Sequence, residues 1–193
     1  YKEEGYLPET MNNFLALIGW NPGTEQELFT PEELVEAFTL EKIQRSGGAF
    51  NEEKLKWMNK EYLQKLSGEE LLKYVESALP ETIKKLPQFF TDRLTKLTPS
   101  IIERVHNKIE ITEAAKIGEY NWAFDEPDYS SELLKWKKDD TYKDALPRLK
   151  EALNLLESAD YSEASSVKEA LWSYAEEIGR GELLWPLRVA LSG

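Results

Sequence analysis

The sequence contains no cysteine and a single histidine, His106, among its 193 residues. The absence of cysteine excludes disulfides, iron–sulfur clusters and thiolate zinc sites, and it is compatible with a reducing compartment. One histidine also excludes metal sites built from several histidines. We interpret His106 as a surface residue of a helix, although its ordinary titration range leaves its charge open.

Long apolar runs are missing as well. No segment approaches the ~20 apolar residues that span a bilayer, and the first five residues lack the basic and apolar blocks of a signal peptide. We therefore expect no membrane partner and a cytoplasmic location. The chain begins without methionine and ends directly after a strongly patterned apolar segment, so we expect a fragment of a longer protein.

Residue patterns that support catalysis are also missing. Gly47-Gly48 fits neither of the glycine patterns that cradle phosphates. Adjacent carboxylates such as Glu32/Glu33 and Asp139/Asp140 do not face each other on a helix, and we interpret them as solvated charge. The chain is thus expected to contain no catalytic residue, no cofactor site and no metal site.

The formal net charge of −12 argues against a nucleic-acid partner, because contacts with phosphate require Lys and Arg. Net charge, however, sums over all surfaces. An RNA site needs only one face with a few arginines and aromatic residues. The charge therefore weakens the case for RNA binding without deciding it.

Helical patterns run through almost the whole chain and predict an all-α fold. Capping boxes at Thr30 and Ser67 and a start at Asn51 mark three helix beginnings. Gly19 and Gly179 are expected to end helices in the left-handed conformation. The predicted helical segments are 8–18, 31–38, 51–62, 68–79, 81–97 with a break near Pro87, 98–109 opening at Pro99, 133–136, 145–156 and 167–178.

Two segments stand apart from this pattern. Residues 121–131 are expected to form a loop held by the buried rings of Trp122, Phe124 and Tyr129. Residues 183–191 are apolar nearly all round and are expected to be buried, apart from Arg188.

Two stretches of sequence resemble bacterial-type glutamyl-tRNA synthetases. The first consists of Gly5-Tyr6-Leu7-Pro8-Glu9 and Asn13-Phe14-Leu15-Ala16-Leu17-Ile18-Gly19-Trp20, continued by Phe50, Lys54-Leu55 and Trp57-Met58-Asn59. The second is Trp185-Pro186-Leu187-Arg188-Val189-Ala190-Leu191-Ser192-Gly193. The apolar members of both would be core residues in any helical domain. Their order and separation are what carry the resemblance.

The resemblance implies the anticodon-binding, helical part of a class I ligase, preceded by part of a stem-contact region. The implied domains are residues 1–66 (stem-contact region and start of the helical domain), 67–145 (first anticodon-binding subdomain) and 146–193 (second, C-terminally truncated subdomain). The parent enzyme would use ATP and Mg²⁺ to attach glutamate to tRNA(Glu), as a monomer. Neither ATP-binding signature of that class occurs in the sequence, so this chain is expected to be inactive alone.

Three residues correspond to positions that contact the anticodon in the family. Arg104 falls where discriminating members inspect the third anticodon base, or it is an exposed arginine on a charged helix. Arg188 falls at another anticodon-loop arginine, or it is a buried guanidinium paired with an internal carboxylate. Trp185 could stack on a base, but we favour a core position for it.

Two other classes of protein compete with tRNA recognition as interpretations of the sequence. An acidic helical protein–protein interaction module would present an exposed apolar groove in place of an arginine-bearing face. A free-standing enzyme of another chemistry is disfavoured by the missing nucleophile, metal and phosphate motifs.

Overall fold

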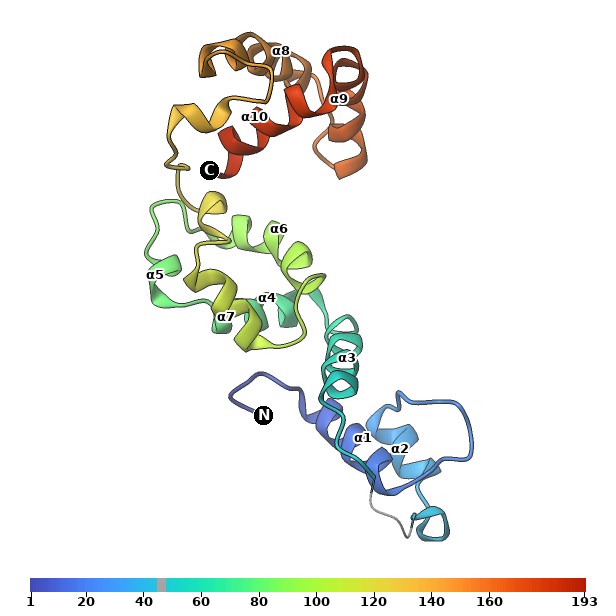
Figure 1. Cartoon of the computed structure of the whole chain (residues 1–193). Helices are drawn as coiled ribbons and strands as arrows, with labels where there is room; N and C mark the ends of the chain where they lie inside the picture. Colours follow the sequence, from blue (N-terminus) through green and yellow to red (C-terminus); the bar gives the residue numbers. More distant parts are fainter. Residues whose placement is uncertain (45–47) are drawn as a thin grey trace. The chain divides into compact units, whose positions relative to one another are not determined.

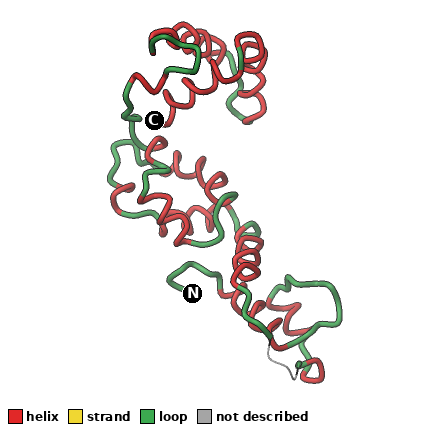
Figure 2. Tube along the Cα trace, in the orientation of Figure 1, coloured by secondary structure: helices red, strands yellow, loops and turns green. Residues whose placement is uncertain are grey.

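The computed structural model describes residues 1–44 and 48–193, and it is built from helices joined by loops (Figure 2). In this part of the chain, the only extended pairing is an isolated antiparallel bridge between Trp20 and Ile43. The prediction of an all-α fold is confirmed. The predicted end of a unit at Gly47-Gly48 falls partly outside the described residues. No helix among the described residues combines the length and the apolar character needed to cross a membrane.

The helices belong to two compact units, Tyr1–Phe124 and Asp125–Gly193 (Figure 1). The first unit contains α1 (Pro8–Gly19), α2 (Pro31–Ala37), η1 (Leu40–Lys42), α3 (Glu52–Leu63), α4 (Gly68–Ala78), α5 (Glu81–Lys84), α6 (Thr91–Ile102), α7 (Lys108–Lys116) and η2 (Asn121–Ala123). The second contains η3 (Ser131–Leu134), η4 (Tyr142–Asp144), α8 (Ala145–Glu157), α9 (Ala164–Ile178) and α10 (Arg180–Ser192). The three-part organisation implied by the resemblance stays a prediction.

The helix starts predicted at Thr30, Asn51 and Ser67 are confirmed. The Thr30 hydroxyl accepts a hydrogen bond from the Glu33 N–H at 3.1 Å, and the Glu33 carboxylate accepts one from the Thr30 N–H at 2.8 Å. Ser67 and Glu70 form the same reciprocal pair at the start of α4, and Asn51 caps α3. These pairs satisfy backbone donors that the first helical turn leaves without partners.

The predicted left-handed stop at Gly19 is wrong. Gly19 is the last residue of α1, and the chain continues in extended conformation at Trp20, whose side chain is almost fully buried. The antiparallel pairing of Trp20 with Ile43 therefore accompanies the extended conformation that follows α1. The other predicted stop is confirmed, because Gly179 has a φ of 108° and ends α9.

The predicted helix opening at Pro99 is also wrong, whereas the break near Pro87 is confirmed. Pro99 lies inside α6, which starts at Thr91. Proline has no N–H to donate to the carbonyl four residues earlier, which here belongs to Thr95. The helix continues through Pro99 without that hydrogen bond.

In the first unit, α4 packs against α6 and α7, and α1 packs against α3. The larger core lies among α4, α6 and α7 and is centred on Leu63, Val75, Leu94, Ile101, Ile111 and Phe124. The fully buried Phe124 lies 5.1 Å from Phe89, centroid to centroid. This contact and the buried Tyr120 fix the segment that follows α7. The prediction of buried rings is confirmed for Phe124 but wrong for Trp122, which is 46% exposed, and Tyr129 is only partly buried.

In the second unit, α10 packs against α8, α9 and η3. Its buried residues are Leu183, Pro186 and Val189, which recur at helical spacing and form one face. Leu184 and Leu191 are exposed, so the expectation that the whole segment 183–191 is buried is wrong for the other face.

The interpretation of Asp139 as solvated charge is also wrong. The Asp139 side chain is 4% exposed, and Arg148 donates to both of its oxygens at 2.8 and 2.6 Å. The Trp136 N–H donates to the same carboxylate at 2.8 Å. Hydrogen bonding from Arg148 lowers the pKa of Asp139, although desolvation opposes this effect. The buried Asp139 carboxylate and the partly buried Arg148 guanidinium thus form an ion pair.

Candidate nucleic-acid interface

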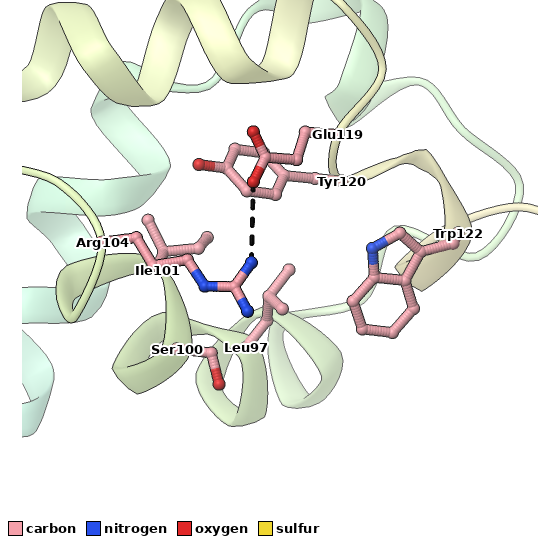
Figure 3. Close-up of a pocket in the computed structure, with 7 residues that line it drawn as sticks. All are labelled: Leu97, Ser100, Ile101, Arg104, Glu119, Tyr120 and Trp122. Carbon is pink, nitrogen blue, oxygen red and sulfur yellow. Dashed lines mark ion pairs between the residues drawn. The ribbon is translucent and has the colours of Figure 1, made fainter. Parts of the chain in front are cut away.

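Arg104 follows the C-terminal end of α6 and faces a hollow in the first unit (Figure 3). The hollow is formed by α6 and by the segment after α7, and its lining residues are Leu97, Ser100, Ile101, Arg104, Glu119, Tyr120 and Trp122. Its volume is about 210 Å³, below the ~300–1,000 Å³ of typical small-molecule sites. This size suits one protruding group of a larger ligand.

The Arg104 side chain is 74% exposed, and its Nη1 lies 3.7 Å from Oε1 of Glu119. This separation exceeds the ~2.7–3.2 Å of an N–H···O hydrogen bond. The Glu119 carboxylate therefore orients the guanidinium by charge and leaves its N–H groups available to a ligand.

Trp122 provides the opposite wall of the hollow. Figure 3 shows the indole and the Arg104 guanidinium on opposite sides, with Leu97 between them. The adjacent Tyr120 is buried, and this burial raises the pKa of its hydroxyl to about 12, so the ring is neutral. An arginine plane and an exposed indole are the side chains on which unpaired RNA bases stack.

Two further cations extend the interface along α6. Arg93 and Lys96 border an adjoining depression that shares Leu97, Ser100 and Trp122 with the hollow. Arg93 donates from Nη1 to the Ala123 carbonyl at 3.1 Å, which holds it beside Trp122. Because positions three or four residues apart share one helix face, the basic residues gather on one side of α6. A chain of net charge −12 can thus present a locally basic surface.

The second unit holds the other two residues that the resemblance indicated. Trp185 is 38% exposed, so the favoured core position is wrong. Its Nε1 donates to the Leu133 carbonyl at 2.8 Å. Its ring centroid lies 5.7 Å from that of Trp136. Arg188, one helical turn further along α10, is exposed, so the alternative of a buried guanidinium paired with an internal carboxylate is wrong.

Glu119, Trp122, Arg93 and Lys96 were not identified as site residues from the sequence. The available sequence signal for Arg93 and Lys96 was their three-residue spacing, which places both on one face of a helix. Nothing local indicated that Glu119 would meet Arg104. In residues 1–44 and 48–193, no group of three or more His, Cys, Asp or Glu side chains is arranged to hold a metal ion.

Two family models match the chain. The model described as "Anticodon binding domain" matches residues 69–193, which include Arg104, Glu119, Trp122 and the whole second unit. The model described as "tRNA synthetases class I (E and Q), catalytic domain" matches residues 1–57. The candidate interface lies entirely within the first match.

Curated relatives resemble the chain over nearly its full length. A glutamate–tRNA ligase of Clostridium novyi is 38% identical over 196 residues, covering 99% of this chain and 39% of the relative. One of Flavobacterium johnsoniae is 35% identical over 196 residues, covering all of this chain and 37% of the relative. The chain thus spans less than two fifths of the length of these relatives.

Solved structures agree with these matches. The crystal structure of a glutamate tRNA ligase from Elizabethkingia meningosepticum, in complex with its amino acid, has a TM-score of 0.72 and 28% sequence identity. The match covers 99% of this chain and 36% of that one. A glutamate–tRNA synthetase from Elizabethkingia anophelis gives a TM-score of 0.69 at 29% identity, with the same coverage.

Proposed function

Because the chain belongs to the anticodon-binding domain family, whose model matches residues 69–193, we propose that it is the tRNA(Glu)-recognition part of a glutamate–tRNA ligase. The observation that carries the proposal is the hollow in which Arg104 faces the exposed Trp122. The parent enzyme attaches glutamate to tRNA(Glu) with ATP and Mg²⁺. Residues 1–57 match the family's catalytic domain but hold neither ATP-binding signature, so this chain contributes recognition and not chemistry.

Arg104 reads the third anticodon base in this proposal. That base is a cytosine in tRNA(Glu) and a guanine in tRNA(Gln). An unpaired cytosine offers N3 and O2 as acceptors, which match the parallel donors of a guanidinium. Guanine presents N–H donors at the equivalent edge, and these oppose the arginine.

Arg188 and the exposed part of Trp185 supply a second contact with the anticodon loop. A guanidinium binds phosphate oxygens or base edges, and an indole that keeps 38% of its surface exposed can still stack on one face. The Trp185 N–H already donates to Leu133, so its contribution is stacking and not hydrogen bonding.

The wider organisation follows the family. Residues 1–66 contact the tRNA stem, and residues 67–145 and 146–193 bind the anticodon loop. The protein acts as a cytoplasmic monomer. The family match favours this function over an acidic protein–protein interaction module.

Binding of the chain to a synthetic anticodon stem-loop of tRNA(Glu) tests the proposal. The affinity is measured at low and moderate salt with the third anticodon base varied. We expect salt-dependent binding that prefers cytosine and is lost in Arg104→Ala. Lys116→Ala, which removes an exposed cation of α7 outside the hollow, is the matched control and should retain the preference. Binding without any preference at the third base would contradict the role of Arg104.

A further inference from the structure

We propose that Glu119 is a second base-reading residue, which acts beside Arg104 and excludes uracil from the third anticodon position. This role rests on the proposed recognition of the anticodon by the hollow. Glu119 and Arg104 come from different segments, one after α7 and one after α6, and both side chains line the hollow. They therefore present a carboxylate and a guanidinium to the same ligand.

The separation of the two groups allows them to face one base edge together. Oε1 of Glu119 and Nη1 of Arg104 lie 3.7 Å apart, and both side chains are substantially exposed. Because the hydrogen-bonding groups of a base lie along one side of its ring, two protein groups this close can contact neighbouring positions of that edge. Trp122, on the opposite wall, offers a ring face that would fix the plane of the base.

Together the two side chains present the acceptor oxygens of a carboxylate followed by the two parallel donors of a guanidinium. A carboxylate accepts only, and a guanidinium donates only, through N–H groups in a fixed fork. The Watson–Crick edge of cytosine carries the complementary order, because its N4 amino group donates and its N3 and O2 accept. Cytosine can therefore satisfy Glu119 and both donors of Arg104 at once.

The edge of uracil does not match this order of acceptors and donors at two positions. Its O4 accepts and would face the Glu119 carboxylate, and its N3–H donates and would face Arg104. Adenine matches at N6 and N1 but lacks a third acceptor. Guanine can donate N1–H and N2–H to the two oxygens of the Glu119 carboxylate, but it then leaves only O6 as an acceptor for the two donors of Arg104. Glu119 thus governs cytosine against uracil, whereas Arg104 governs cytosine against guanine.

The existing contact between Glu119 and Arg104 does not prevent a base from binding to both side chains. An ion pair between exposed side chains contributes little to stability, and the 3.7 Å separation leaves the guanidinium donors free of a direct hydrogen bond to Glu119. An entering base therefore displaces water from these groups. It breaks no strong interaction within the protein.

Four anticodon stem-loops that differ only in the third anticodon base (C, U, A or G) test the role of Glu119. Their affinities are measured for the unsubstituted chain, Glu119→Gln and Glu119→Ala, and thermal unfolding checks that the variants fold. The matched control is Glu113→Gln, which removes the same charge from an exposed position of α7 outside the hollow. In Glu119→Gln the amide can donate to O4 of uracil, so we expect the cytosine-over-uracil ratio to fall about tenfold, as expected when one charge-assisted hydrogen bond is lost.

The cytosine-over-guanine ratio should stay the same or rise in both Glu119 variants, because Arg104 sets the preference for cytosine and guanine loses at least as many contacts with Glu119 as cytosine does. A uniform change in affinity for all four stem-loops would overturn the proposal, since it would leave Glu119 only the role of orienting Arg104 by charge. Cytosine preference in the unsubstituted chain combined with an unchanged uracil ratio would overturn it as well, and would leave the proposed function intact. If the unsubstituted chain bound none of the stem-loops even at low salt, both the proposed function and this role of Glu119 would fail.

Discussion

The Asn59 side chain donates from Nδ2 to the backbone carbonyl of His106 at 2.6 Å. Its Oδ1 accepts from the Leu7 N–H at 2.9 Å and from the Thr10 hydroxyl at 3.0 Å. One amide thereby ties α1 and α3 to the turn that precedes α7. Leu7 lies in the segment that matches the catalytic-domain family, and His106 lies in the anticodon-binding match. The two matched segments are thus joined within one compact unit.

Replacing Asn59 by Ala should destabilise the first unit by about 3 kcal/mol, because Leu7, Thr10 and His106 would each keep a polar group without its partner. Chemical denaturation measures this change. Asn12→Ala, at an exposed position of α1, is the matched control and should stay within ~0.5 kcal/mol of the unsubstituted chain. Equal stabilities of the two variants would show that the network contributes nothing.

Replacing Lys96 by Ala should weaken RNA binding by a similar factor for every base at the third anticodon position. Lys96 is exposed on α6 and borders the depression beside the hollow, where it can meet a phosphate but not the base that Arg104 reads. Each lost phosphate contact lowers the slope of log affinity against log salt by about 0.7 for a single strand.

Salt titrations of stem-loop binding test this prediction. Lys73→Ala, in an exposed pair with Glu69 on α4, removes the same charge away from the site and should leave the slope unchanged. A Lys96 variant that altered base preference while keeping the salt slope would contradict a phosphate contact.

Local sequence signals predicted the parts of the fold that depend on local interactions. Thr30 and Glu33 satisfy each other's backbone groups within one helical turn, so the capping box determines the start of α2 whatever surrounds it. At Pro99 the local signal gave the wrong answer. Leu97 and Ile101 on either side of it are buried in the core, and this burial outweighs one lost backbone hydrogen bond.

The candidate site was only partly predictable, because part of it is formed by the packing of segments that lie far apart in the sequence. Arg104 could be identified from the sequence, because the resemblance to the family aligns it with a residue that contacts the anticodon. Its neighbour Glu119 is brought to it by the packing of α7 and by the anchoring of Tyr120 and Phe124 in the core. Trp122 was expected to be buried because aromatic residues usually are. The core instead holds the rings of Tyr120 and Phe124, and Trp122 stays exposed.

Gly181 in α10 leaves room for the ring of Trp136, which gives a prediction about stability. A Cβ atom at Gly181 would lie 2.4 Å from Cζ2 of that ring, so Gly181→Ala must displace the indole. We expect a loss of about 1–3 kcal/mol from overpacking, although alanine favours helix by up to ~1 kcal/mol. Gly68→Ala is the matched control, because Gly68 also lies in a helix and has open space around its Cβ position. It should be neutral or slightly stabilising, and thermal unfolding of both variants measures the difference.

The ion pair of Asp139 and Arg148 predicts a stability that depends on pH. Replacing Asp139 by Asn would leave Arg148, whose side chain is only 15% exposed, without its partner, at a cost of about 3 kcal/mol near pH 7. Asp140→Asn, at the neighbouring exposed position, should change stability by less than ~0.5 kcal/mol. Denaturant unfolding of both variants separates the ion pair from a general effect of net charge.

The sign of the pH effect follows from the lowered pKa of Asp139 in the folded chain, compared with its ordinary value of 3.8. A carboxyl whose pKa is depressed by folding adds stability that is fully present above the unfolded value and is lost as pH falls through the folded value. The stability difference between the unsubstituted chain and Asp139→Asn should therefore stay constant above 3.8 and shrink as the pH falls further. A difference that stayed the same into this acidic range would mean that Asp139 acts through its shape and hydrogen bonds, and not through its charge.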